Sequence, residues 1–122
     1  MILVDTSLWI DHLRSPHAEL MAHLERAAVL AHPWVTGELA LGTLRRPAEV
    51  IDLLDGLPQA TVATPADTLV LIRQAQLAGT GVGYVDAQLL AATLLTPGAF
   101  LWTADRRLEH AAQRLGVAFA AA

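Results

Sequence analysis

Two acidic side chains come directly after apolar runs that are typical of buried strands. Asp5 follows the run that begins at Met1, and Asp105 closes the run that begins at Ala99. In open α/β sheets, functional groups gather at the carboxyl ends of the strands. Because parallel strands end at the same edge, we expect both carboxylates at one edge of a sheet. A simpler interpretation of Asp5 is that it caps a helix, and Thr6 and Ser7 are also residue types that cap helices.

Two further acids lie within apolar helical segments. Glu38 is surrounded by apolar residues, and Asp86 is the only charged residue between Tyr84 and Leu95. A buried carboxylate without a partner is costly, so it pairs, takes up a proton or binds a metal. The alternatives are solvent exposure for Glu38 and a favourable first-turn position for Asp86. Nothing local in the sequence brings these two acids to the sheet edge.

If the four carboxylates share one pocket, their chemistry points to a divalent cation. Like charges at close range raise each other's pKa values, and the chain has no lysine to neutralise them. Oxygen ligands favour Mg²⁺ or Mn²⁺ over zinc. A pair of such ions suits phosphodiester cleavage, in which one activates water and the other stabilises the leaving oxygen.

The charge balance argues against a nucleic-acid enzyme unless cations bind. The net charge is −4, whereas nucleic-acid binders are usually basic. Bound cations would reverse that charge locally. Arg45, Arg73, Arg106 and Arg107 could then hold backbone phosphates, although each taken alone is more simply a solvated surface residue.

The elements that must position these residues alternate between strands and helices. Apolar runs predict strands at Ile2–Ser7, which leaves the core at Asp5, and at Val29–Ala31, Thr61–Ala63, Ala99–Thr103 and Val117–Phe119. Helical patterns are found from Leu8 to Leu13, His17 to Ala28, Pro33 to Leu44, Pro47 to Leu54, Pro65 to Leu77, Tyr84 to Leu95, and Asp105 to Leu115. This alternation predicts an α/β fold with a parallel sheet, in one domain over residues 1–122.

Composition narrows the class of protein further. Cysteine is absent, which excludes disulfides and thiolate chemistry, and no apolar run approaches the ~20 residues of a membrane span. We therefore expect a soluble cytoplasmic protein. Hydrophobic residues make up 54% of the chain, so we also expect an exposed apolar patch that meets a second copy or another protein.

Other residue types carry less chemistry. The five histidines are scattered and favour structural or surface roles, and the three tryptophans favour the core. Residues 79–83 are rich in glycine but lack the Gly-Lys-Ser/Thr ending of a phosphate-binding loop.

Four short motifs, in order along the chain, resemble those of PIN-domain proteins, and among them the VapC toxins. They are Val4–Ile10, Glu38–Gly42, Val85–Ala92 and Leu101–Asp105. The resemblance implies a three-layer α/β/α fold with a central parallel sheet. It also implies an endoribonuclease that depends on Mg²⁺ or Mn²⁺, usually a homodimer, held inactive by a VapB-type antitoxin.

The resemblance also implies roles for individual residues. The catalytic and metal-binding acids would be Asp5, Glu38, Asp86 and Asp105. The nearby polar support would come from Thr6, Ser7 or Thr103.

Two other functions remain open at this stage. A haloacid-dehalogenase-like phosphatase would use Asp5 as nucleophile, but such proteins carry Asp-x-Asp and this chain has Ser7 at the second position. A domain that only binds a partner protein, with idle acids, is the other alternative. No histidine partner marks Ser7, which disfavours a serine hydrolase.

Overall fold

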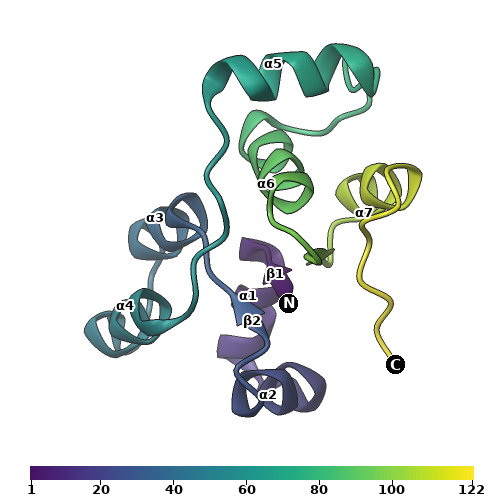
Figure 1. The fold of residues 1–122 in the computed structure, drawn as a ribbon. Coiled ribbons are helices and arrows are strands. Elements are labelled where there is room, and N and C mark those ends of the chain that lie inside the picture. Colours follow the sequence, from purple (N-terminus) through teal and green to yellow (C-terminus); the bar gives the residue numbers. More distant parts are fainter.

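A three-stranded parallel sheet lies at the centre of the computed structural model, which describes residues 1–122 (Figure 1). The strands are β1 (Ile2–Val4), β2 (Val29–Leu30) and β3 (Phe100–Trp102), in the order β2-β1-β3. β1 is the middle strand, and Ile2 lies opposite both Val29 and Phe100. All of β1 is buried, as expected of a parallel strand covered on both faces.

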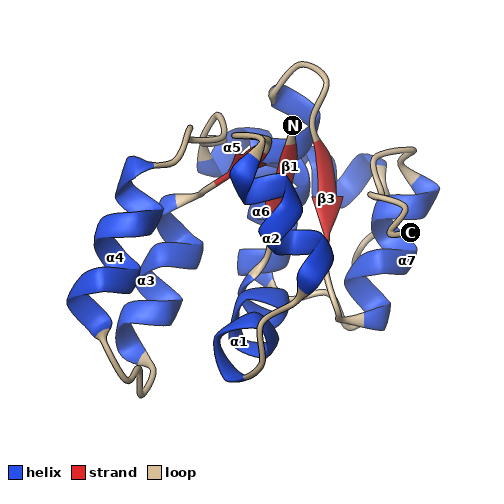
Figure 2. Cartoon of the chain, turned by 90° about the horizontal axis from the view of Figure 1, so that it is seen from below, coloured by secondary structure: helices blue, strands red, loops and turns tan.

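Seven helices surround the sheet in an α/β/α arrangement. They are α1 (Thr6–Arg14), α2 (Ala18–Glu25), α3 (Pro33–Leu41), α4 (Pro47–Gly56), α5 (Pro65–Gln74), α6 (Tyr84–Leu95) and α7 (Arg106–Arg114). Figure 1 shows α5 and α6 on one side of the sheet and α2 on the other. Figure 2 shows α3 and α4 side by side on one flank and α7 on the opposite flank. The α/β fold with a parallel central sheet is therefore confirmed.

The core forms where the apolar helix α6 packs between its neighbours. Every residue from Ala87 to Thr93 is buried, as predicted for a helix that is apolar nearly all round. Its bounds agree with the sequence prediction, because Gly83 precedes it and Thr96 with Pro97 follows it. Trp9 and Trp102 are buried in the core as well.

Two of the predicted strands are not present as strands: one is wrong, and the other is reduced to a single bridge. Thr61–Ala63 is not a strand, because the backbone N–H of Thr61 donates to the side chain of Thr96 at 2.9 Å instead of to a strand. The pairing near it is an isolated bridge between Ala31 and Gln59. Val117–Phe119 contributes one bridge, between Ala118 and Leu101.

Helix α3 is shorter than the predicted helix, which extended to Leu44. It ends at Leu41, where Gly42 turns the backbone to an extended conformation, so Arg45 is not on the same helix as Glu38. Leu41 is 91% exposed. Trp34 is 40% exposed and lies 6.0 Å from the ring of Tyr84, so it is not a core residue.

Two of the histidines have the structural roles expected of them. His17 caps α2 and the buried His32 caps α3, each by accepting a backbone N–H on its side chain. No helix combines the length and the apolar character that a bilayer crossing requires.

Candidate active site

Asp5 and Asp105 lie at the carboxyl ends of β1 and β3, which are hydrogen-bonded neighbours. Both acids therefore lie at the same edge of the sheet, as predicted. Each is also the N-cap of the helix that follows: Asp5 accepts from the N–H of Leu8, and Asp105 accepts from the N–H groups of Arg107 and Leu108. The interpretation of Asp5 as a helix cap is therefore confirmed, in addition to its place at the sheet edge, whereas Thr6 is the first residue of α1 and not its cap.

A polar network holds the buried carboxylate of Asp5, which is 4% exposed. Ser7 Oγ donates to one oxygen and Thr103 Oγ1 donates to the other, each at 2.7 Å. The two hydroxyls accept in turn: Thr103 Oγ1 from the N–H of Asp105 at 2.9 Å, and Ser7 Oγ from the N–H of Ala104 at 3.1 Å. The network fixes the orientation of Asp5 and ties it to the end of β3.

Glu38 reaches this edge through packing of α3 against α1. Val35 and Leu39 are buried, which turns this part of α3 towards the core. Glu38 itself is exposed, and its Oε1 accepts from Thr6 Oγ1 at 2.6 Å. Since Thr6 follows Asp5 in the chain, this bond places Glu38 beside the end of β1. The sequence did not predict that contact.

Asp86 enters the same region from the first turn of α6 and is half-buried. Burial, followed by the negative charges of Asp5, Asp105 and Glu38, raises the pKa of Asp86 to about 6. A hydrogen bond from the backbone of Gly83 acts in the opposite direction. The structure therefore brings the other three predicted acids within electrostatic reach of Asp86.

Burial also raises the pKa of Asp5, against the lowering effect of its hydrogen bonds from Ser7, Thr103 and Leu8. The charge of Asp105 raises it further. The environment of this carboxylate thus opposes its ionisation in spite of three donors.

No basic side chain neutralises the four acids. The ion pairs of the chain are His23 with Glu19 at 3.6 Å and Arg46 with Glu49 at 3.5 Å, neither of which includes a member of the cluster. An all-carboxylate donor set with uncompensated charge suits a hard divalent cation such as Mg²⁺ or Mn²⁺.

The carboxylate oxygens of the cluster are suitable ligands for a cation, but the side chains are not positioned to bind one together. No three acidic or histidine side chains lie close enough together to ligate one ion as they stand. Carboxylates that lie near one another without a cation repel each other, which favours separation of the side chains. Ligation of one ion by three of these residues would therefore require side-chain movement.

The glycine-rich loop before α6 serves a purpose that sequence reasoning missed. Gly81 has a φ of +87°, and a Cβ placed on it would lie 2.6 Å from Cδ of Arg107. Arg107, which follows Asp105 closely, thus packs over the loop that leads to Asp86. The glycines signalled an unusual loop, but only the fold identifies what approaches it.

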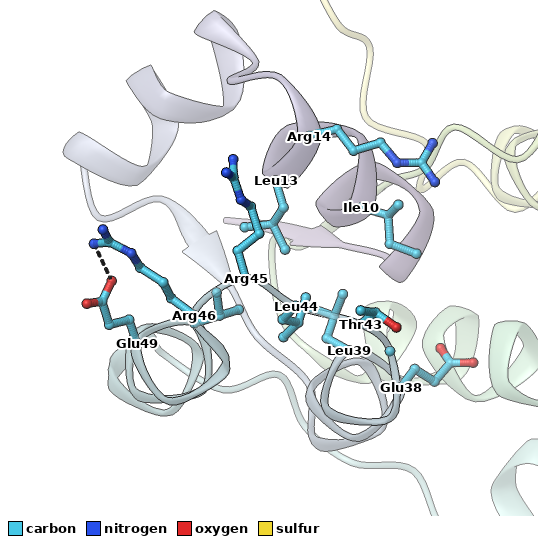
Figure 3. Close-up of a pocket in the computed structure, with 12 residues that line it drawn as sticks. Ile10, Leu13, Arg14, Glu38, Leu39, Thr43, Leu44, Arg45, Arg46 and Glu49 are labelled. Carbon is cyan, nitrogen blue, oxygen red and sulfur yellow. Dashed lines mark ion pairs between the residues drawn. The ribbon is translucent and has the colours of Figure 1, made fainter.

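Glu38 also lines a cavity of about 1010 Å³ between α1 and the segment that joins α3 to α4 (Figure 3). The other three acids do not line it. This hollow is therefore a neighbour of the acid cluster, joined to it through Glu38.

Comparison with known proteins agrees with this geometry. The family model described as PIN domain matches residues 2–114. The chain is 47% identical over 120 residues to the protein named Ribonuclease VapC32 in two strains of Mycobacterium tuberculosis, CDC 1551 / Oshkosh and ATCC 25618 / H37Rv. Each alignment covers 98% of this chain and 97% of the relative.

Proposed function

The chain belongs to the PIN-domain family, and from that premise we propose that it is an endoribonuclease toxin of the VapC type, acting in the cytoplasm. The observation that carries this proposal is the gathering of four uncompensated acids at one edge of the sheet. The name of the M. tuberculosis relative and its 47% identity to this chain support the same activity.

We assign cation binding to Asp5, Glu38 and Asp86, with Asp105 assisting them or holding a second ion. Bound Mg²⁺ or Mn²⁺ would supply Lewis-acid chemistry, which activates water and stabilises charge on the phosphate oxygens. The chain's own contribution is to hold Asp5 through Ser7 and Thr103.

Attack of water on the phosphorus, in line with the leaving oxygen, would yield a 5′-phosphate and a 3′-hydroxyl. The carboxylates would have to be ionised to bind a cation, so the raised pKa of Asp86 makes this step sensitive to acid. Thr6, by donating to Glu38, would keep that side chain near the reacting phosphate.

Two protein partners belong to the proposal: a second copy of the chain and a VapB-type antitoxin. Large apolar side chains remain exposed on several elements, including Leu41 at 91% and Leu69 at 55%. Burying such residues against a partner would be favourable, and it would account for the high hydrophobic content.

The decisive experiment compares Asp5→Asn with the unaltered protein on total RNA with Mg²⁺. We expect a loss of cleavage of roughly a hundredfold or more, because even outer partners of metal ligands are worth 10–100-fold. Chelation with EDTA should abolish cleavage by the unaltered protein, and mapping of the cut ends tests the predicted products.

Asp11→Asn is the matched control, since Asp11 is an exposed aspartate of α1 outside the cluster. It should cleave like the unaltered protein, and circular dichroism should show the native fold in both variants. Unchanged activity of a folded Asp5→Asn protein would refute the assignment. Calorimetry with Mn²⁺ provides a second test, because a domain with idle acids would bind none.

The phosphatase alternative gains no support from the geometry. Ser7 occupies the position where those enzymes carry a second aspartate, and its hydroxyl donates a hydrogen bond to Asp5. Absence of a phosphoenzyme after incubation with a phosphate ester is the expected result.

A further inference from the structure

The groove beside Glu38 holds three of the chain's eight basic residues. Arg14 comes from the end of α1, and Arg45 and Arg46 come from the segment between α3 and α4. Figure 3 shows Arg14 and Arg45 reaching out from these two different elements, with Glu38 at one end of the groove. In a chain with a net charge of −4, this is a local concentration of positive charge.

Two of these arginines have no partner within the chain. Arg46 pairs with Glu49 at 3.5 Å, but Arg14 and Arg45 make no ion pair and their guanidinium groups donate no hydrogen bond. All three are exposed. Free guanidinium groups are well suited to hold phosphate oxygens, because they donate two parallel hydrogen bonds.

The groove is continuous with the candidate active site through Glu38. That residue lines the groove and also accepts the hydrogen bond from Thr6, next to Asp5. A strand of nucleic acid whose cleaved phosphate lay at the acids could therefore run directly along the groove.

We propose that Arg14 and Arg45 bind backbone phosphates of the single-stranded RNA substrate on one side of the cleaved bond. This inference rests on the proposed ribonuclease activity and adds a binding subsite to it. Apolar side chains such as Leu13 and Leu39 form part of the lining. They offer surface for sugar and base but no hydrogen-bond readout, so the subsite grips the backbone and accepts many sequences.

The test measures RNA affinity and cleavage for Arg14→Gln and Arg45→Gln. Affinity for a short fluorescent single-stranded RNA is measured by anisotropy in the Asp5→Asn background with Mg²⁺, at several salt concentrations. Each substitution should weaken binding roughly three- to tenfold and lower the slope of log affinity against log salt by about 0.7, the value for one phosphate contact on a single strand.

Steady-state cleavage by the otherwise unaltered protein should show the same effect as a raised KM. The kcat should change little, because the arginines hold the strand at a distance from the reacting atoms. Arg26→Gln is the matched control, since Arg26 is an exposed arginine at the end of α2, away from the groove.

Several outcomes would overturn the subsite. One such outcome is that both groove variants bind RNA as tightly as Arg26→Gln does. Metal-dependent cleavage by the unaltered protein would then still support the proposed ribonuclease activity. Another is weakened binding of a VapB-type antitoxin with unchanged RNA affinity, which would assign the groove to a protein. Failure of the Asp5→Asn parent to bind RNA at all would also refute it. Full activity of Asp5→Asn, in contrast, would refute the proposed function and leave the affinity comparison to judge the groove.

Discussion

The environments of Asp5 and Asp86 make both carboxyl groups harder to ionise than an aspartate in water. Both have raised pKa values, and in both the first cause is burial. They differ in what surrounds them: Asp5 accepts hydrogen bonds on both oxygens, whereas Asp86 faces the charges of the other three acids. A cation bound at the cluster would therefore favour the ionised form of Asp86 directly.

We predict that Asp86 destabilises the metal-free protein at neutral pH and that Asp86→Asn removes this effect. Its folded pKa is about 6, above the unfolded value of 3.8, so the folded state binds more protons between these values. Its contribution to stability is therefore greatest below about pH 4 and is lost as the pH rises through about 6. Thermal unfolding in EDTA should show a higher Tm for Asp86→Asn than for the parent at pH 7.

The difference between the two proteins should shrink on acidification to about pH 5, as Asp86 becomes protonated in the folded parent. The pKa values of His12 and His32 are lowered, so these residues make stability depend on pH in the opposite direction to Asp86. Because both histidines are present in the parent and in the variant, their effect cancels in the difference between the two proteins. Asp52→Asn, at an exposed position of α4, serves as control. A difference in Tm that does not vary with pH would contradict the prediction.

At the scale of elements, the cluster depends on how helices meet the end of the sheet. β1 and β3 bring Asp5 and Asp105 together by pairing directly. Glu38 and Asp86 depend instead on two helices, α3 and α6, that begin far from β1 in the chain. α3 packs against α1, and α6 packs against α5 and β3. The hydrogen bond from Thr6 to Glu38 and the close approach of Arg107 to Gly81 add to this packing.

We predict that Thr6→Val lowers cleavage roughly tenfold and leaves the fold intact. Valine keeps the shape of threonine but cannot donate to Glu38, and loss of a partner that orients a metal ligand costs 10–100-fold. Thr36→Val, on the same helix as Glu38 and at a residue whose side chain makes no hydrogen bond, should be close to neutral. Equal activity of the two variants would show that the bond does not position Glu38.

We predict that Gly81→Ala and Gly79→Ala each lower the free energy of unfolding by about 1 kcal/mol, because both glycines have positive φ angles. A Cβ at Gly79 meets nothing, whereas one at Gly81 meets the flexible, exposed side chain of Arg107. Arg107 can swing away, so the further loss for Gly81→Ala should be small.

Urea denaturation measures both losses. Gly56→Ala, at an open helical position without a positive φ, should not be destabilising. A much larger loss for Gly81→Ala than for Gly79→Ala would mean that Arg107 is fixed in place.

At the scale of the whole molecule, the fold leaves apolar surface uncovered. Thirteen large hydrophobic residues are exposed, and they include Trp34 and Tyr84, whose rings lie 6.0 Å apart. The small core therefore leaves many of the chain's large apolar residues on the surface, in line with the 54% hydrophobic composition.

We predict that the purified chain forms a homodimer in solution. Sedimentation equilibrium should give twice the chain mass, and the Tm should rise with protein concentration, because dissociation accompanies unfolding of a dimer. A monomer mass at every concentration, with a constant Tm, would refute the dimer and leave the antitoxin as the partner for this surface.

The sequence alone determined the elements that depend on local patterns. The limits of α6 follow from an apolar run between a glycine-rich loop and a proline, and the common edge for Asp5 and Asp105 follows from two apolar runs that end in acids. Glu38 and Asp86 also stood out in the sequence as acids within apolar helical segments, and the resemblance to a family then assigned them to the same site as Asp5 and Asp105. Neither the local sequence pattern nor the charge predicted that these two side chains lie at the same sheet edge as Asp5.

Only the tertiary structure decided the contacts between elements. The early end of α3 at Gly42, the bond from Thr6 to Glu38 and the packing of Arg107 on Gly81 all join segments distant in sequence. Periodicity reports which face of an element is apolar, because that depends on the repeat of the helix or strand itself. It does not report which neighbour covers that face, since that choice is made by the packing of all elements at once.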